Sequence, residues 1–458
     1  MNYKLESLLH SSTIPSAALS SSIALPPAPS WPMIKDSEER VRRNTPTIGE
    51  SQFSSIRENG LVFIDKSMLI QEFLRDQSTV SLILRPRRSG KTIASTMIYE
   101  FFRPCADRGL FRSLNIFNDH ESMKKIGQFP CVLLSLADLS GSTWEEQYQR
   151  LVNLIAELYR NHAGMLLPFI EPDQQTLYNS IRTKAAPKQE VERSLRYLSM
   201  WYFEVYYKYT IFVVDEYDRG LETLFQSLIS QKVDSYEQYD WSDYTEAERF
   251  YGSFFQSALK DNKYMYKSMM FGVSRVAKAG IMSGLNNVSV YTALDNRYID
   301  KFGFTQSEVD MLFNTFQLSQ NGISMDQIKK MYNGYQTSSP DVVLYNSWSL
   351  MKVIHSRDAT QNHWGQTGSL ASIRYVFVSS RNETLRNQLS ELLSDRGLSA
   401  EEIRSDVNYR DLARGDECTI WNLLFHAGYC TAIPEPSNPI KFLLKIPNDE
   451  VRQTLKAE

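Results

Sequence analysis

The sequence predicts an α/β fold, in which a three-layer core is built on a parallel sheet and followed by a mainly α-helical C-terminal region. Apolar runs at residues 79–84, 129–136 and 209–214 have the length and composition of strands that are buried on both faces. Apolar residues at helical spacing follow the first two runs, over residues 93–102 and 144–158. This alternation of strand and helix signals is typical of βαβ units.

The length and composition limit the number of domains and the class of protein. A chain of 458 residues has room for two or three domains. Residues 1–44 are rich in Ser, Pro and Ala and are expected to form a disordered tail, because they can bury little apolar surface. We expect the α/β domain over residues 45–300 and the mainly helical lid and C-terminal region over 301–458. With 50 Lys plus Arg against 53 Asp plus Glu, the net charge of −3 argues against a general attraction to nucleic acid or membrane.

Cysteine usage and hydropathy favour an intracellular protein, cytoplasmic or nuclear. The four cysteines are widely spaced and contain no C-x-x-C pair, so we interpret them as reduced thiols without a zinc site. No run of about 18 apolar residues is present, so no transmembrane segment is expected. The N-terminus has Lys4 and Glu6 and lacks a compact apolar segment, so we predict no signal peptide and no membrane partner.

Turn and capping residues place the other elements in order. We expect a short strand at 61–66, a helix at 68–74, a capping box at Thr143–Glu146 and a strand at 268–273. The polar and aromatic residues 230–248 predict a surface excursion. A capped helix is expected to begin at Thr305, and the chain shows no internal repeat.

The segment between the strand at 79–84 and the helix at 93–102 resembles a phosphate-binding loop. It contains Arg85, Pro86, Arg87, Arg88, Ser89, Gly90, Lys91 and Thr92. Backbone amides at a helix N-terminus bind phosphates, Lys91 is placed to reach the outer phosphates, and the Thr92 hydroxyl is placed to bind Mg²⁺. The general pattern has a glycine where Arg85 stands, which weakens the match. The alternative is a basic turn with no ligand.

Two further strand ends carry candidate catalytic residues. The run at 209–214 is followed by Asp215, a candidate metal ligand, and Glu216, a candidate for activating water; this is the Walker B arrangement. After the strand at 268–273, Ser274 is a candidate phosphate sensor and Arg275 a candidate charge stabiliser, because ligands collect outside the carboxyl ends of parallel strands. An acidic junction and ordinary loop residues are the alternatives.

These motifs together resemble the AAA-ATPase-like family, whose phosphate loop reads Arg-Pro-Arg-Arg-Phe-Gly-Lys-Ser. The resemblance extends over about residues 46–350. It includes Ile64–Ser67, Val214–Asp218, Gly272–Arg275, Gly284–Asn287, Phe302–Thr305, Tyr332–Tyr335 and Tyr345–Trp348. It implies that Arg85 is a family trait, and that ATP and Mg²⁺ are the cofactors. Family members often carry a C-terminal PD-(D/E)xK nuclease-like domain, and we expect none within these residues.

The sequence leaves three functional hypotheses open. The first is a Mg-dependent ATPase whose turnover drives a conformational switch. The second is a nucleotide-stabilised module that binds a protein or a nucleic acid without turnover, having lost a nuclease-like effector. The third is a degenerate fragment without activity. The partner, the oligomeric state and the process coupled to hydrolysis are not indicated by the sequence.

Overall fold

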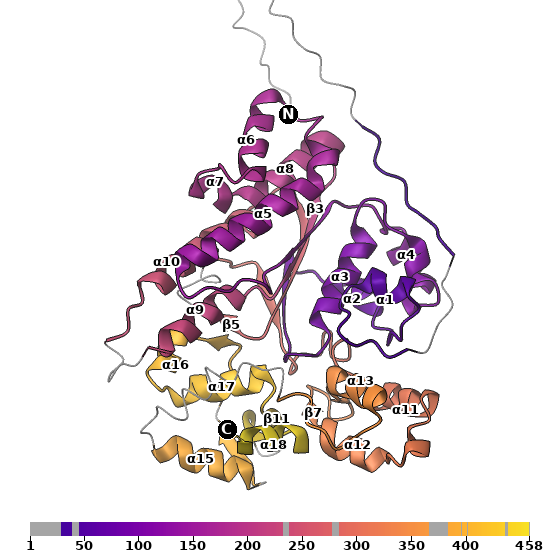
Figure 1. The fold of residues 1–458 in the computed structure, drawn as a ribbon, viewed down its shortest axis with the longest axis vertical. Coiled ribbons are helices and arrows are strands. Elements are labelled where there is room, and N and C mark those ends of the chain that lie inside the picture. The colour runs from indigo at the N-terminus through magenta and orange to yellow at the C-terminus, as the bar shows by residue number, and fades with distance from the viewer. Residues whose placement is uncertain are drawn as a thin grey trace, which may run out of the picture.

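The computed structural model describes residues 29–38, 45–231, 238–276, 284–365, 383–394, 396–400, 402–435 and 438–457 (Figure 1). Its centre is a five-stranded sheet with the strand order β2-β3-β4-β1-β6, and all neighbouring strands are parallel. The strands are β1 (Val80–Leu84), β2 (Cys131–Ser135), β3 (Thr210–Asp215), β4 (Met265–Gly272) and β6 (Val288–Tyr291). This confirms the predicted parallel sheet. The sequence patterns missed β6, which is short and only half-buried.

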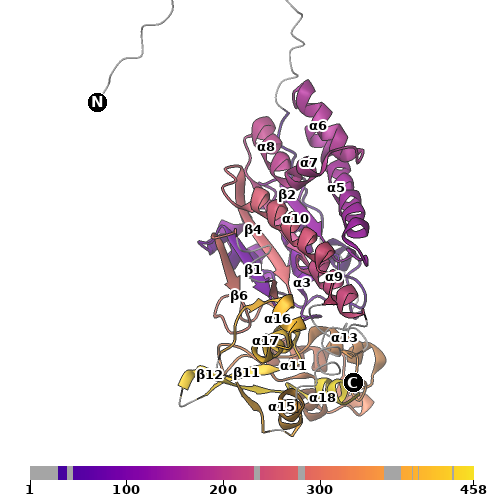
Figure 2. The same cartoon turned by 90° about the vertical axis from the view of Figure 1, so that its left-hand side faces the viewer.

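Helices cover both faces of the sheet, which gives three layers (Figures 1 and 2). Side chains on β3 alternate between two hydrophobic clusters, with Phe212 and Val214 on one face and Ile211 and Val213 on the other. One face is covered by α5 (Trp144–Leu166), α6 (Pro172–Arg182), α7 (Lys188–Glu192), α8 (Ser194–Tyr206), α9 (Arg219–Ile229) and α10 (Ser242–Leu259). The other is covered by α1 (Phe53–Glu58), α2 (Met68–Arg75), α3 (Lys91–Phe102) and α4 (His120–Met123).

The C-terminal region lies against the carboxyl ends of the strands and consists of two parts (Figure 1). The first part is a small helical unit with its own hydrophobic cluster, formed by α11 (Gln306–Thr315), α12 (Met325–Tyr332) and α13 (Ser347–Ser356), with the hairpin β7 (Tyr335–Gln336) and β8 (Val343–Leu344). The second part combines a three-stranded sheet, of β9 (Leu398–Ala400), β11 (Thr431–Glu435) and β12 (Asn438–Lys445), with α15 (Glu383–Leu393), α16 (Tyr409–Ala413), α17 (Glu417–Ala427) and α18 (Asp449–Ala457).

The helical prediction for this region is therefore confirmed, but the region also contains strands. One strand pair crosses the expected boundary near residue 300: β5 (Arg275–Val276) pairs with β10 (Asp406–Val407). Residues of the C-terminal region thus pair with the segment that directly follows β4. Sequence patterns could not show this pairing, because two-residue strands carry no periodic signal.

Several local predictions need correction. Residues 61–66 form no strand: Leu61 makes an isolated bridge with Thr45, and the residues that follow it to Lys66 have no regular secondary structure. Part of the expected disordered tail is packed: Trp31 donates from Nε1 to the Gly127 carbonyl oxygen (2.7 Å). Residues 1–28 and 39–44 lie outside the described residues. In the expected capping box, Glu146 accepts from the Ser142 amide (2.8 Å), so only the Thr143 half of the motif forms.

The predicted surface excursion at 230–248 holds only in part, and residues 232–237 lie outside the described part. Polar residues such as Gln238, Asp240 and Glu246 are exposed, but the described aromatic residues are not. Tyr239 and Tyr244 are buried, and α10 already begins at Ser242. The Trp241 ring stacks near Phe225 of α9, so the aromatic residues of this segment contribute to the core.

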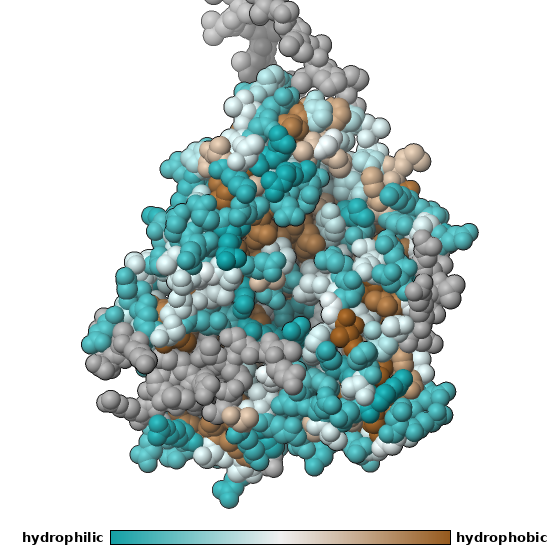
Figure 3. Space-filling model, in the orientation of Figure 1, coloured by the Kyte–Doolittle hydropathy of each residue, from teal (hydrophilic) through white to brown (hydrophobic). Residues whose placement is uncertain are grey.

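The outer surface is mostly hydrophilic on the face that Figure 3 shows, with hydrophobic side chains visible mainly near its middle. Within the described part of the chain, no helix has both the length and the apolar character needed to cross a membrane. All four cysteines are free thiols, and Cys131 and Cys430 are buried.

Candidate functional site

The loop between β1 and α3 ends in a left-handed turn that exposes the N-terminus of the helix. Arg88 and Gly90 have positive φ angles of 64° and 95°, and this conformation costs glycine little. Gly90 is the N-cap residue, and its carbonyl oxygen accepts from the Ala94 amide (3.0 Å). The first amides of α3 therefore have no acceptor within the helix. Together with the positive end of the helix dipole, they provide an anion-binding site.

Lys91 is buried beneath this loop and holds its backbone. Its Nζ donates to the carbonyl oxygens of Arg85 (2.9 Å) and Pro86 (2.8 Å). Burial lowers the pKa of Lys91 to about 8, although Asp215 and Glu216 favour the charged form. A desolvated ammonium group gains strongly from a nearby anion, so Lys91 is chemically suited to a phosphate ligand.

Arg85, at the start of the loop, binds backbone carbonyl oxygens of the neighbouring strands and segments. Its guanidinium donates to the carbonyl oxygens of Leu84 (3.2 Å), Tyr291 (3.4 Å) and Tyr298 (3.1 Å), and lies 5.5 Å from the centre of the Phe302 ring. Burial lowers its pKa to about 10, so Arg85 is still charged at neutral pH. Its contacts tie the end of β1 to β6 and to the segment that follows β6.

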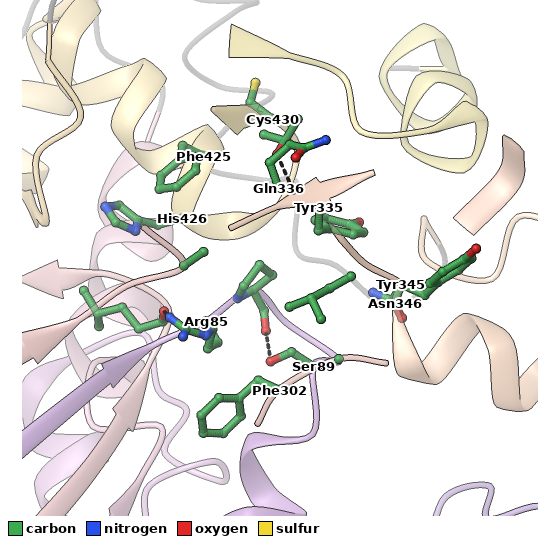
Figure 4. A pocket seen from close by; sticks show the side chains of 16 residues that line it. Arg85, Ser89, Phe302, Tyr335, Gln336, Tyr345, Asn346, Phe425, His426 and Cys430 are labelled. Atoms are coloured by element: carbon green, nitrogen blue, oxygen red, sulfur yellow. Dashed lines mark hydrogen bonds between the residues drawn. The ribbon is translucent and has the colours of Figure 1, made fainter. Parts of the chain in front are cut away.

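Arg85 and Pro86 line a small cavity of about 50 Å³ behind the loop, together with residues of the C-terminal region (Figure 4). Pro86 also approaches Gly428 so closely that a Cβ atom there would lie 2.8 Å from the proline Cβ. The loop residues of the larger cavity described next are Arg87 to Thr92. The predicted phosphate-binding set is therefore divided between two sides of the loop.

A cavity of about 580 Å³ lies on the front side of the loop, within the size range of small-molecule sites. The lining includes Lys66, Ala137, Gly272, Val273 and Lys301, and otherwise comes from four parts of the chain. These are the loop and first turn of α3 (87–94), the N-terminal segment (Thr47, Gly49, Glu50, Ile56, Val62 and Ile64), the turn after β3 (Glu216, Asp218, Arg219 and Glu222), and the helical unit (Gly303, Phe304, Ser347, Trp348 and Met351).

The two predicted acids at the end of β3 occupy different environments. Asp215 is buried, and burial raises its pKa to about 6 despite the nearby Thr92 hydroxyl and Lys91. Its Oδ1 accepts from the Glu216 amide (3.1 Å). Glu216 lines the cavity and has a φ of 50°, a left-handed conformation that is uncommon for glutamate and common at functional sites.

The environment of Asp215 fits a magnesium ion. Its Oδ2 is buried and has no hydrogen-bond partner among the described residues, and the Thr92 side chain lies beside it. Carboxylate and hydroxyl oxygens are suitable ligands for Mg²⁺, which takes its other ligands from water and phosphate. The described residues contain no cluster of three or more His, Cys, Asp or Glu side chains that could hold a metal.

Asp218 is a buried acid whose role the sequence reasoning missed. Its Oδ2 accepts from the amides of Val273 (2.9 Å) and Ser274 (3.0 Å), and burial raises its pKa to about 6. The Tyr217 hydroxyl donates to the Ser274 carbonyl oxygen (2.7 Å). These bonds connect the turn after β3 to the end of β4. The signal was visible in the sequence as the second aspartate of Asp-Glu-Tyr-Asp.

Ser274 and Arg275 do follow β4, as predicted, but neither is among the described residues that line the large cavity. Ser274 is buried beside Tyr409 of α16. The Arg275 amide donates to the Ser405 carbonyl oxygen (3.2 Å) at the start of the β5–β10 pair. Val273, immediately before them, does line the cavity.

The helical unit contacts the loop directly. The Arg88 guanidinium lies 4.5 Å from the centre of the Trp348 ring, and the Ser347 hydroxyl donates to the Arg88 carbonyl oxygen (2.9 Å). The Gly303 amide donates to the Ser89 carbonyl oxygen (2.9 Å). Trp348 lies in one of the family elements seen in the sequence, where no role was predicted for it.

A glycine-containing loop at a helix N-terminus, a buried lysine and acids at the end of a nearby parallel strand define a P-loop nucleotide-binding architecture. A family model described as Predicted AAA-ATPase matches residues 47–282. The chain belongs to this family, which confirms the resemblance seen in the sequence. It is accordingly a P-loop protein of the ATPase type.

Two individual proteins give further comparisons. The uncharacterized protein in the vnfD 5' region of Azotobacter chroococcum mcd 1 is 25% identical over 417 residues, covering 89% of this chain and 68% of that protein. A solved structure of Drosophila ORC bound to AT-rich DNA and Cdc6 is matched over 88% of this chain and 91% of that one. Its identity is 10% and its TM-score 0.19, which is too low to inform fold or function.

Proposed function

We propose that the chain binds Mg-ATP in the 580 Å³ cavity and hydrolyses it, and that turnover changes the contact between the phosphate loop and the helical unit. The observation that carries the proposal is the lining of this cavity. One space is bordered by the helix N-terminus at Gly90, the acid Glu216 and the helical unit at Trp348. A single ligand in this space could therefore have its phosphates bound by the helix N-terminus, its attacking water activated by Glu216, and its site covered by the helical unit.

Binding begins with the charge of the phosphates. The first amides of α3 and the Lys91 ammonium are assigned to the outer phosphates, replacing the carbonyl contacts that Lys91 now makes. Thr92 and Asp215 are assigned to hold Mg²⁺, which would supply charge neutralisation of the phosphates when bound. The apolar residues Ile56, Val62 and Met351 line another part of the cavity and are suited to the base.

Glu216 is assigned to the attacking water. Its carboxylate lines the cavity, whereas Asp215 is buried behind it, so the two acids have separate environments and separate roles. A glutamate that accepts a hydrogen bond from water orients the lone pair of the water oxygen toward phosphorus. As the oxygen–phosphorus bond forms, the glutamate takes the proton of the water. Ser274 as phosphate sensor and Arg275 as charge stabiliser stay proposals for a form in which the turn after β4 approaches the cavity.

The proposed switch uses the contacts between Arg88 and the helical unit. The Trp348 ring and the Ser347 hydroxyl, at the start of α13, both contact Arg88. If phosphate binding rearranges the loop, these two contacts between the loop and α13 change. A ligand shifts such an equilibrium only by its differential affinity for the two arrangements. Trp348 therefore provides an intrinsic fluorescence reporter for nucleotide binding.

The test is Lys91→Ala with thermal denaturation in the presence of Mg-ATP. At about a hundredfold excess over the dissociation constant, a bound ligand adds about 2.7 kcal/mol to the free energy of unfolding. The wild type and a control variant at the exposed Lys124 should show this stabilisation, and Lys91→Ala should not. Equal stabilisation in all three proteins would refute the assignment. Binding without phosphate release in the wild type would support the alternative interaction module.

A further inference from the structure

Two arginines and one glutamate form a cluster in the cavity wall, here called the Arg–Glu cluster: Arg87, Arg219 and Glu222. Arg87 belongs to the phosphate loop and donates from its guanidinium to Glu222 Oε1. Arg219, at the start of α9, donates from its guanidinium to Glu222 Oε2 (3.3 Å). One carboxylate on α9 therefore holds an arginine from the loop and an arginine from its own helix, and all three residues line the cavity.

The ion pairs of the cluster are partly exposed to solvent, and the cluster contains two arginines and one carboxylate. The side chains of Arg87, Arg219 and Glu222 keep 26%, 27% and 19% of their surface exposed, and partly exposed ion pairs are weak. The Arg219 Nε is buried and has no hydrogen-bond partner among the described residues. Burial lowers the pKa of Arg87, but the carboxylate of Glu222, followed by those of Asp218 and Glu216, outweighs this effect, so the pKa is raised. Arginine side chains stay charged at neutral pH, and Arg219 thus has a donor without a partner among the described residues.

We propose that the outer phosphates of a bound nucleoside triphosphate replace Glu222 as the partner of Arg87 and Arg219, and that Arg219 is a catalytic residue. The inference rests on the proposed function and names a cation that the sequence analysis did not consider. A guanidinium group binds phosphate oxygens through two parallel hydrogen bonds, and a terminal phosphate offers more charge and more acceptors than a carboxylate. Glu222 binds both arginines in this structure and opposes the incoming anion.

Arg219 is better placed than Arg275 to act on the reacting phosphate. It lines the cavity three residues after Glu216, whereas Arg275 does not line it. In the reaction, water forms a bond to the terminal phosphorus and gives its proton to Glu216. The bond from that phosphorus to the bridging oxygen breaks, and the electron pair stays on the departing nucleoside diphosphate. A guanidinium beside this phosphorus stabilises the charge that spreads over its oxygens.

The experiment measures ATP affinity and turnover in single variants of the full chain, with Mg²⁺ present. Glu222→Gln should tighten ATP binding by about three- to tenfold, because it removes a competing and like-charged group. Arg219→Ala should lower kcat by at least about a hundredfold with a much smaller change in affinity, and Arg219→Lys should restore part of the rate. Arg87→Ala should weaken ATP binding and reduce the gain produced by Glu222→Gln.

Glu248→Gln is the matched control, because Glu248 forms a similarly shielded ion pair with Arg410 (3.0 Å) and does not line the cavity. It should leave affinity and kcat unchanged, and circular dichroism checks that every variant is folded. Weaker or unchanged ATP binding in Glu222→Gln overturns the inference while leaving the proposed function intact. A normal kcat in Arg219→Ala with a large loss in Arg275→Ala also overturns it. A wild type that binds no ATP refutes the proposed function as well.

Discussion

The affinity for ATP should fall as the pH rises above about 8, because Lys91 must carry a proton to bind phosphate. Burial lowers the pKa of Lys91 to about 8 in the nucleotide-free protein. A bound polyphosphate raises that pKa again, since it stabilises the charged form. Below pH 8, Lys91 is mostly charged already, so the affinity is nearly independent of its titration. Above it, binding must first protonate Lys91, which costs about 1.4 kcal/mol for each pH unit.

The expected loss is about tenfold in affinity at pH 9 relative to pH 7, with a slope that approaches one decade per pH unit above that. The two buried acids of the site and the terminal phosphate titrate below this window. The pKa values of Asp215 and Asp218 are both raised to about 6, and the terminal phosphate ionises with a pKa of about 6. Trp348 fluorescence or calorimetry can measure the dissociation constant between pH 7 and 9.5, at constant ionic strength.

Lys91→Arg separates this effect from general changes with pH, because a guanidinium group stays charged throughout the range. The variant is expected to bind more weakly than the wild type at pH 7, since the buried site fits a smaller ammonium group, and to show a flat pH profile. A constant dissociation constant in the wild type from pH 7 to 9.5 would refute the reasoning. So would the same slope in wild type and Lys91→Arg.

Three further predictions concern the other parts of the site. Glu216→Gln should retain ATP binding while turnover falls by about 10²–10⁴-fold in a phosphate-release assay; an unchanged rate would exclude Glu216 as the base. The dependence of ATP binding on Mg²⁺ should weaken as the pH falls through about 6, where Asp215 becomes protonated, and Asp215→Asn should show weak Mg²⁺ dependence at every pH. Gly90→Ala should lower the free energy of unfolding by about 1–2 kcal/mol through its φ of 95° alone, because a Cβ there meets no atom within 4 Å. Gly164→Ala, in helix α5 and equally unobstructed, should instead be neutral or stabilising in the same denaturant titration.

Local sequence was sufficient to predict elements whose signals are short in range. Thr79–Leu84, with its apolar run, and the capping box at Thr305 and Glu308 fold as expected, because burial on both faces and helix capping depend on neighbouring residues. Val288–Tyr291 became a strand through pairing with β1, which supplies hydrogen bonds that its own pattern does not demand. Gly90 and Lys91 were identifiable from the sequence because they are neighbours in one loop. Asp215 and Glu216 were identifiable because they directly follow one apolar run.

The sequence by itself determined the α/β class, the phosphate loop and the acids at the end of β3, since each is encoded within a continuous segment. Only the tertiary structure decided which side chains share a space. It turned Arg85 away from the large cavity, placed Arg275 in a strand pair with residues from the far end of the chain, and brought Arg219 and Glu222 beside Arg87. The physical reason is that side-chain direction at a loop depends on long-range packing and on which distant groups neutralise its charge, and neither leaves a periodic trace in the sequence.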